Sequence, residues 1–105
     1  MEYVDKPSHV LTPTIVVYEV YKTVKRSTNE SMACEAISAL HDTIIVPLDA
    51  YLARTAADIS LTYKLSMADA IIYTTARKFN ARLITSDADF KSLPGVEYIA
   101  TPQEN

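Results

Sequence analysis

Glycine and cysteine are nearly absent from this chain of 105 residues. Gly95 is the single glycine, which argues against a turn-rich all-β fold and against a glycine-rich loop that cradles phosphates. Cys34 is the single cysteine, so an intramolecular disulfide and a cluster of thiolate metal ligands are both excluded. No apolar run reaches the roughly 20 residues that a membrane span needs, and no signal peptide opens the chain, so we expect a cytoplasmic location.

Positive charge is also scarce. The chain has 10 Lys and Arg residues against 13 Asp and Glu residues, and the net charge is −3. Its basic residues are scattered along the sequence, so the sequence contains no evident basic stripe for tight binding of a duplex. Any polyanionic ligand must therefore be attracted by a local charge, because the field of the whole molecule does not attract it.

Short apolar runs alternate with helical stretches, which indicates a single α/β domain over residues 1–105 with a mainly parallel sheet covered by helices. The expected strands are residues 9–11, 43–46, 81–86 and 96–100. The expected helices run over residues 13–26 after an N-cap at Thr12, over 30–40, from the cap Asp49 to about Tyr63, and from the cap Ser66 to about Phe79.

The apolar residues of these helices predict the core. The first helix is apolar over most of its circumference, which predicts deep burial of Ile15, Val16, Val17, Val20 and Val24. The other expected core contacts are Met32, Ala36, Ala39, Leu40, Leu52, Ala56, Ile59, Ala68, Ile71, Ile72, Thr75, Ala76 and Phe79.

Two helical carboxylates have surroundings that disfavour a charge. Glu19 lies in mid-helix among valines and tyrosines, where it is either a surface residue paired with Lys22 or a ligand that points into a cleft. Asp69 follows Ser66 by three residues, so the two form a potential capping box. A metal-binding role for Asp69 is compatible with capping, because a helix start also stabilises negative charge.

Two further carboxylates, Asp87 and Asp89, follow the expected strand at residues 81–86. One interpretation is a turn between strand and loop, where aspartate is common. The other is a ligand site, because open α/β sheets bind ligands beyond the carboxyl ends of their strands.

The order of these motifs resembles the PIN-domain ribonucleases, especially the VapC-type toxins. The resemblance is carried by residues 12–21 (TPTIVVYEVY), 67–76 (MADAIIYTTA), 83–90 (LITSDADF) and 93–96 (LPGV), and it covers almost all of residues 9–99. It implies a three-layer α/β/α fold and cleavage of RNA with Mg²⁺ or Mn²⁺. It also implies inhibition by a cognate antitoxin protein, and usually a homodimer.

The resemblance also assigns roles to residues. It implies that Glu19, Asp69 and Asp87 are the catalytic metal ligands, with Asp89 as an auxiliary ligand, and that Thr85 and Ser86 orient the site through their hydroxyl groups. Hard divalent cations of this kind prefer such oxygen ligands.

One departure from the family leaves an alternative open. Family members begin with a central strand that ends in an aspartate ligand, and we expect that strand to be missing from this chain. The alternative is therefore a PIN-like remnant that binds a partner protein without cleaving RNA. A phospho-accepting receiver domain is disfavoured, since no lysine follows a strand. His9 and His41 have no partner pattern for acid–base catalysis, so we interpret both as structural or exposed.

Overall fold

The computed structural model describes residues 10–85, 90 and 92–98, which form four helices and four short strands. The elements follow one another as β1 (Leu11–Pro13), α1 (Thr14–Ser27), α2 (Glu30–Leu40), β2 (Ile44–Val46), α3 (Ala50–Tyr63), α4 (Met67–Lys78), β3 (Leu83–Thr85) and β4 (Val96–Tyr98). The α/β class that the sequence predicts is confirmed. No helix in this part of the chain is long and apolar enough to cross a membrane.

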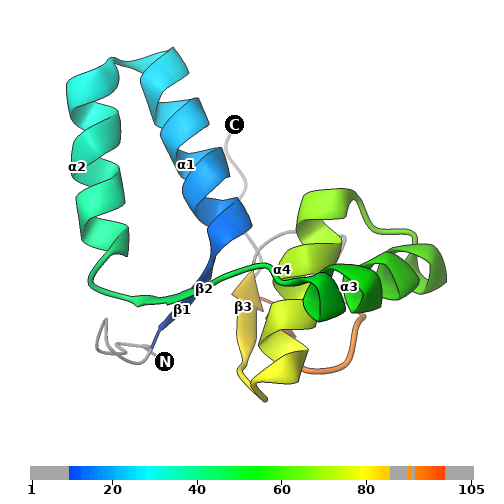
Figure 1. Ribbon diagram of the computed structural model, residues 1–105. Helices are drawn as coiled ribbons and strands as arrows, with labels where there is room; N and C mark the ends of the chain where they lie inside the picture. Colours follow the sequence, from blue (N-terminus) through cyan, green and yellow to red (C-terminus); the bar gives the residue numbers. More distant parts are fainter. Residues whose placement is uncertain (1–9, 86–89, 91, 99–105) are drawn as a thin grey trace, which may run out of the picture.

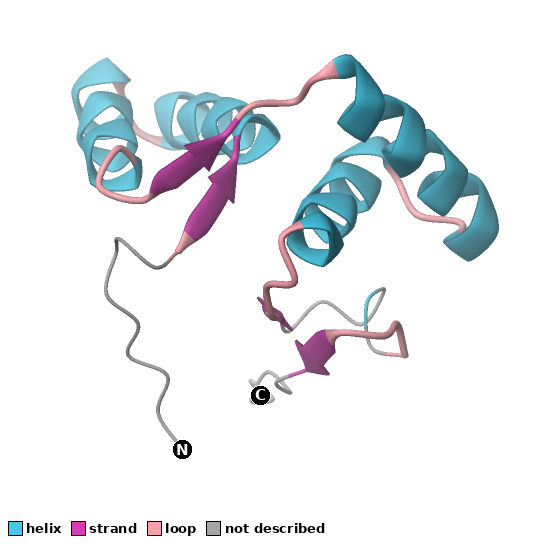
Figure 2. Ribbon diagram, turned by 60° about the horizontal axis from the view of Figure 1, so that its bottom comes forward, coloured by secondary structure: helices cyan, strands magenta, loops and turns pink. Residues whose placement is uncertain are grey.

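The four described strands form two separate parallel pairs. β1 pairs with β2, with Leu11 opposite Ile44, and β3 pairs with β4, with Leu83 opposite Val96. The α1–α2 hairpin lies above the first pair, whereas β3 lies beside α4 (Figure 1). The two pairs are well separated in Figure 2. Among the described residues, each strand is therefore paired along one edge only.

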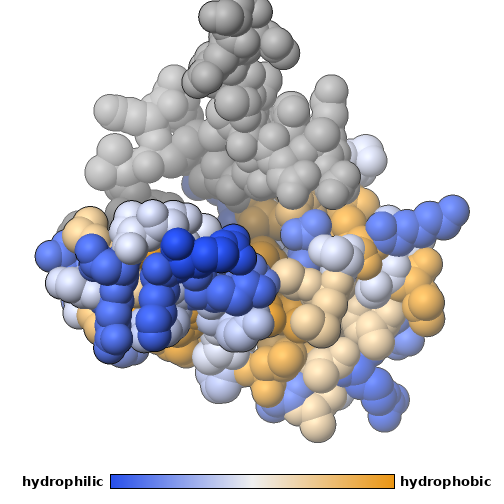
Figure 3. All heavy atoms as spheres, turned by 90° about the horizontal axis from the view of Figure 1, so that it is seen from above, coloured by the Kyte–Doolittle hydropathy of each residue, from blue (hydrophilic) through white to orange (hydrophobic). Residues whose placement is uncertain are grey.

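The hydrophobic core lies between the α3–α4 pair and the second strand pair. Its buried members are Ala56, Leu65, Ala70, Ile71, Tyr73 and Phe90. Partly buried side chains from β3, β4 and α1 pack against them, including Ile15 of α1. The two helix pairs differ in surface character. Seen from above, the α1–α2 end of the molecule is mostly hydrophilic, and hydrophobic surface is concentrated over the α3–α4 half (Figure 3).

Two helix starts form as the sequence predicts. The Asp49 carboxylate accepts a hydrogen bond from the Leu52 N–H at 2.8 Å, which caps α3. The Ser66 hydroxyl accepts one from the Asp69 N–H at 3.4 Å, which caps α4. The predicted N-cap of α1 at Thr12 is wrong. Thr12 lies in β1, and Pro13 precedes α1 without a side-chain capping bond.

Four predictions about burial also need correction. No residue of α1 is fully buried, because the helix lies over the short β1–β2 pair and its apolar residues are only half-buried. Met32 and Phe79 are exposed (45% and 49%), and the buried contact of α2 is Ala33. Ala39 is exposed as well. Phe79 faces solvent because it is the C-cap residue of α4, beyond the buried turns.

The strand bounds differ slightly from those predicted. β1 begins at Leu11, and Val10 lies outside it, although the Val10 carbonyl accepts a bond from the Ile44 N–H at 2.9 Å. The predicted strands at 81–86 and 96–100 are observed over Leu83–Thr85 and Val96–Tyr98. Residues 9, 86, 99 and 100 of the predicted strands lie outside the described residues. Gly95 precedes β4 with a φ of +79°, a left-handed conformation that suits glycine in the predicted turn.

Candidate functional site

Glu19 lies in the middle of α1, and its side chain is half-buried. The predicted alternative, an ion pair with Lys22, is not formed. The Lys22 ammonium instead lies 5.1 Å from the centre of the Tyr18 ring. Within the described part of the chain, Glu19 makes no ion pair at all. The surface alternative therefore lacks its expected ion pair, and the ligand role of Glu19 stays a prediction.

Asp69 lies in the first turn of α4 and is also half-buried. Its backbone N–H donates to the Ser66 hydroxyl, which forms the Ser66 half of the predicted capping box. The helix dipole and the free amide groups of this turn favour negative charge at the same place. The bond to Ser66 uses the backbone N–H of Asp69, so the ligand role of its carboxylate stays a prediction.

The fold brings the elements that carry these residues together. α1 contacts α4, and α4 contacts β1. In Figure 1, α4 runs downward and β3 returns upward beside it, so the carboxyl end of β3 lies on the same side as the start of α4.

Part of the predicted site lies outside the described residues. This applies to Ser86, Asp87 and Asp89, while Thr85 ends β3. Within residues 10–85, 90 and 92–98, no three His, Cys, Asp or Glu side chains are grouped closely enough to hold a metal ion. The convergence of Glu19, Asp69 and Asp87 accordingly stays a prediction. His41 is exposed at the end of α2, as expected, and His9 lies outside the described residues.

One local group of basic residues lies on α1, in a chain whose other basic residues are scattered. Lys22, Lys25 and Arg26 line one shallow groove together with two tyrosines. Their spacing of three and four residues places them near one another on the helix surface.

The fold and the order of its elements define a class of α/β domain with short parallel strands and four helices. The family profile described as "PIN domain" matches residues 1–96, and the chain belongs to the PIN-domain family. Members of this family are generally nucleases, and they typically use divalent metal ions. The resemblance found in the sequence is therefore confirmed.

A solved structure gives a closer comparison. The chain is similar to a chain of a "Toxin-antitoxin complex from Klebsiella pneumoniae", with 27% sequence identity and a TM-score of 0.72. The match covers 90% of this chain and 75% of that chain. A search of curated proteins found no match.

Proposed function

We propose that this chain is a VapC-like ribonuclease toxin that cleaves RNA phosphodiester bonds with Mg²⁺ or Mn²⁺ in the cytoplasm. The observation that carries the proposal is the half-buried Glu19 carboxylate, which has no described cation beside it, on a helix that contacts the α4 helix of Asp69. The PIN-domain match over residues 1–96 supports the same conclusion.

The available donor set fits a hard divalent ion, because Glu19, Asp69 and Asp87 all offer carboxylate oxygens. Asp89 would be an auxiliary ligand, and Thr85 and Ser86 would orient the site. When bound, the ion supplies a lowered pKa for a coordinated water and neutralises charge on the phosphate. Any of the three principal carboxylates can accept the proton of the attacking water, whose oxygen bonds to phosphorus as the P–O bond to the leaving strand breaks.

We also propose two protein partners. The similar chain comes from a toxin–antitoxin complex, which supports a cognate antitoxin as the inhibitor of this chain. A second copy is the other partner. An apolar groove of about 520 Å³ between α3 and α4 includes the exposed residues Leu61 and Met67, at 81% and 70% exposure, and such a surface favours burial in a dimer.

A labelled single-stranded RNA, incubated with the chain and Mn²⁺ or Mg²⁺ and resolved on a denaturing gel, tests the activity. We expect cleavage that EDTA stops and that Asp69→Asn abolishes, because asparagine keeps some capping ability but loses the charge that the cation requires. The matched control is Asp58→Asn on the exposed face of α3, which should cleave normally. Circular dichroism must show equal helix content in both variants.

The test also addresses the second candidate, a PIN-like remnant that binds a partner without cleaving RNA. The separation of the described strands into two pairs favours this candidate, because a divided sheet is a poor support for a precise site. Absence of cleavage at every metal concentration, with the chain folded, would favour the remnant. Cleavage that persists in EDTA would contradict both candidates.

A further inference from the structure

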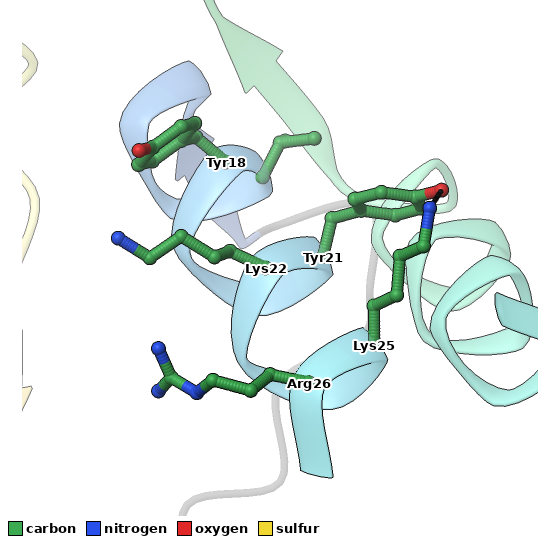
Figure 4. Close-up of a pocket in the computed structure, with 6 residues that line it drawn as sticks. Tyr18, Tyr21, Lys22, Lys25 and Arg26 are labelled. Carbon is green, nitrogen blue, oxygen red and sulfur yellow. Dashed lines mark hydrogen bonds between the residues drawn. The ribbon is translucent and has the colours of Figure 1, made fainter. Parts of the chain in front are cut away.

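A shallow groove of about 580 Å³ lies along the outer face of α1, and its lining combines cations with aromatic rings (Figure 4). It is lined by Val17, Tyr18, Tyr21, Lys22, Lys25 and Arg26. In the close-up, Tyr18, Lys22 and Arg26 point to one side of the helix, and Tyr21 and Lys25 point toward the side of α2.

The cations of this groove are largely unneutralised. Lys25 forms an ion pair with Glu30 at 3.9 Å, but both side chains are at least half exposed, so the pairing is weak. Lys22 and Arg26 are exposed and make no ion pair with any residue that the structure describes. Two positive charges spaced as i and i+4, with about 5–6 Å between their Cβ atoms, are thus available to an anion.

The rings lie directly beside these charges. The Lys22 Nζ is 5.1 Å from the centre of the Tyr18 ring, and the Lys25 Nζ is 5.4 Å from that of Tyr21. Tyr18 is 57% exposed, so much of its ring is open to solvent. Cations in the last turn also stabilise the helix through its dipole, but that effect does not explain an exposed tyrosine and a lysine one turn earlier.

We propose that this α1 groove binds single-stranded RNA, with Lys22 and Arg26 on successive phosphates and a base stacked on Tyr18. Single-strand binding sites combine these two elements, a positive groove for the backbone and rings for the bases. The inference rests on the proposed ribonuclease function. Glu19 is three residues before Lys22 and seven before Arg26, on the adjoining face of α1, so the groove leads from the proposed metal site.

Fluorescence anisotropy with a labelled oligouridylate in EDTA, at several KCl concentrations, tests the groove without any cleavage. We expect Lys22→Gln/Arg26→Gln to bind several-fold more weakly. The slope of log affinity against log salt should fall by about 1.4, since each phosphate contact on a single strand contributes about 0.7. Tyr18→Ala should lose at least about fivefold in affinity with the slope unchanged.

Two controls separate charge from folding. Arg54→Gln/Lys64→Gln removes two exposed charges from α3 and its end, and it should bind RNA like the unmodified chain. Lys22→Arg/Arg26→Lys keeps both charges on α1 and should keep the salt slope. An unchanged affinity and slope in Lys22→Gln/Arg26→Gln would overturn the proposal, as would an equal loss in the α3 variant.

A competitor identifies the class of ligand. Displacement of the RNA by polyglutamate at equal charge would assign the groove to an acidic protein segment and overturn the RNA proposal. The nuclease proposal fails separately. RNA that binds with the expected salt dependence but is not cut with Mn²⁺ would leave the groove assignment standing. If the unmodified chain cuts RNA but Lys22→Gln/Arg26→Gln binds RNA normally, the groove proposal fails and the nuclease proposal stands.

Discussion

At the scale of single residues, Glu19 and Asp69 offer a test of the metal site that needs no RNA. Clustered carboxylates repel one another, so a divalent ion should bind the folded chain in preference to the unfolded one. Saturating Mn²⁺ or Mg²⁺ should raise the free energy of unfolding by about 2.7 kcal/mol at a hundredfold excess over Kd. Thermal unfolding followed by circular dichroism measures this effect.

The same experiment has a matched control in α2. Glu19→Gln and Asp69→Asn should each lose most of the Mn²⁺-dependent gain, whereas Glu35→Gln, on an exposed position, should keep it. A melting temperature that does not change across millimolar Mn²⁺ would count against a competent metal site. It would leave the PIN-domain fold unaffected.

The scarcity of glycine has a cost at the end of α3. Lys64 is the C-cap residue of that helix and adopts a left-handed conformation with φ 58° and ψ 47°. This conformation costs a residue with a side chain about 1–2 kcal/mol, and glycine adopts it freely. We therefore expect Lys64→Gly to stabilise the chain by about 1 kcal/mol in urea unfolding.

Two variants distinguish this conformational effect from loss of the lysine charge. Lys64→Ala should give no comparable gain, because alanine has the same strain. Thr62→Gly, inside the helix, should give no gain and a slight loss of stability, because glycine has a lower helix propensity than threonine. A similar gain from Lys64→Ala and Lys64→Gly would show that charge, not backbone conformation, controls stability at this position.

At the scale of elements, the sequence predicts best what a few neighbouring residues determine. The caps by Asp49 and Ser66 are confirmed, because each bond joins a side chain to an amide three residues away. The prediction for Thr12 is wrong for a non-local reason. Its hydroxyl lies 2.6 Å from that of Thr43, thirty-one residues along the chain, which ties β1 to the approach to β2.

The same distinction applies to the candidate site. Glu19 and Asp69 can be selected from the order and spacing of motifs, and the structure places both on contacting helices. The distance of Glu19 and Asp69 from Asp87 depends on how the chain from β3 onward packs against α1 and α4. No local sequence pattern determines this packing. Burial in α1 is non-local too, since periodicity identifies an apolar face without showing how much structure covers it.

Tyr73 connects α4 to the turn before β4, and this contact yields a prediction. Its hydroxyl donates a hydrogen bond to the Pro94 carbonyl at 2.6 Å, and its ring packs edge-on against Tyr63 with centroids 6.0 Å apart. Burial raises the pKa of Tyr73 above its ordinary value of 10.0; Arg77 opposes the shift and Tyr63 adds to it. The folded state therefore holds this proton more tightly than the unfolded state does.

The sign of the pH effect follows from this difference. The stabilisation linked to the proton is complete below pH 10 and is lost as the pH rises through the raised pKa, because the unfolded state ionises first. Tyr73→Phe should lower the free energy of unfolding by about 1 kcal/mol at pH 7 and should weaken the alkaline decline. Tyr51→Phe, 69% exposed, is the control and should change neither.

Urea unfolding between pH 7 and 11 gives both quantities for the three chains. An alkaline decline of equal steepness in Tyr73→Phe and the unmodified chain would show that other groups cause it. If Tyr73→Phe is as stable as the unmodified chain at pH 7, the hydrogen bond to Pro94 contributes nothing to the attachment of the turn before β4.

At the scale of the whole molecule, the division of the sheet is the dominant feature. β1 and β3 each have one edge that is not paired with any described strand. Backbone groups on such edges cost about 1–3 kcal/mol each if they are buried without partners, against a total stability of about 5–15 kcal/mol. Exposed edges of this kind also favour pairing with another chain.

We therefore expect these 105 residues, expressed alone, to associate in solution instead of remaining monomeric. Strand pairing between copies and burial of the α3–α4 groove are the two routes, and Leu61→Lys separates them. This variant should reduce association through the groove and leave strand exchange intact, with Asp58→Lys as the control on the same helix. Light scattering reports the mass, and native-state hydrogen exchange reports the protection of β1 and β3. A monodisperse monomer with strongly protected amides in both strands would contradict the prediction, because it would mean that the sheet closes without a second chain.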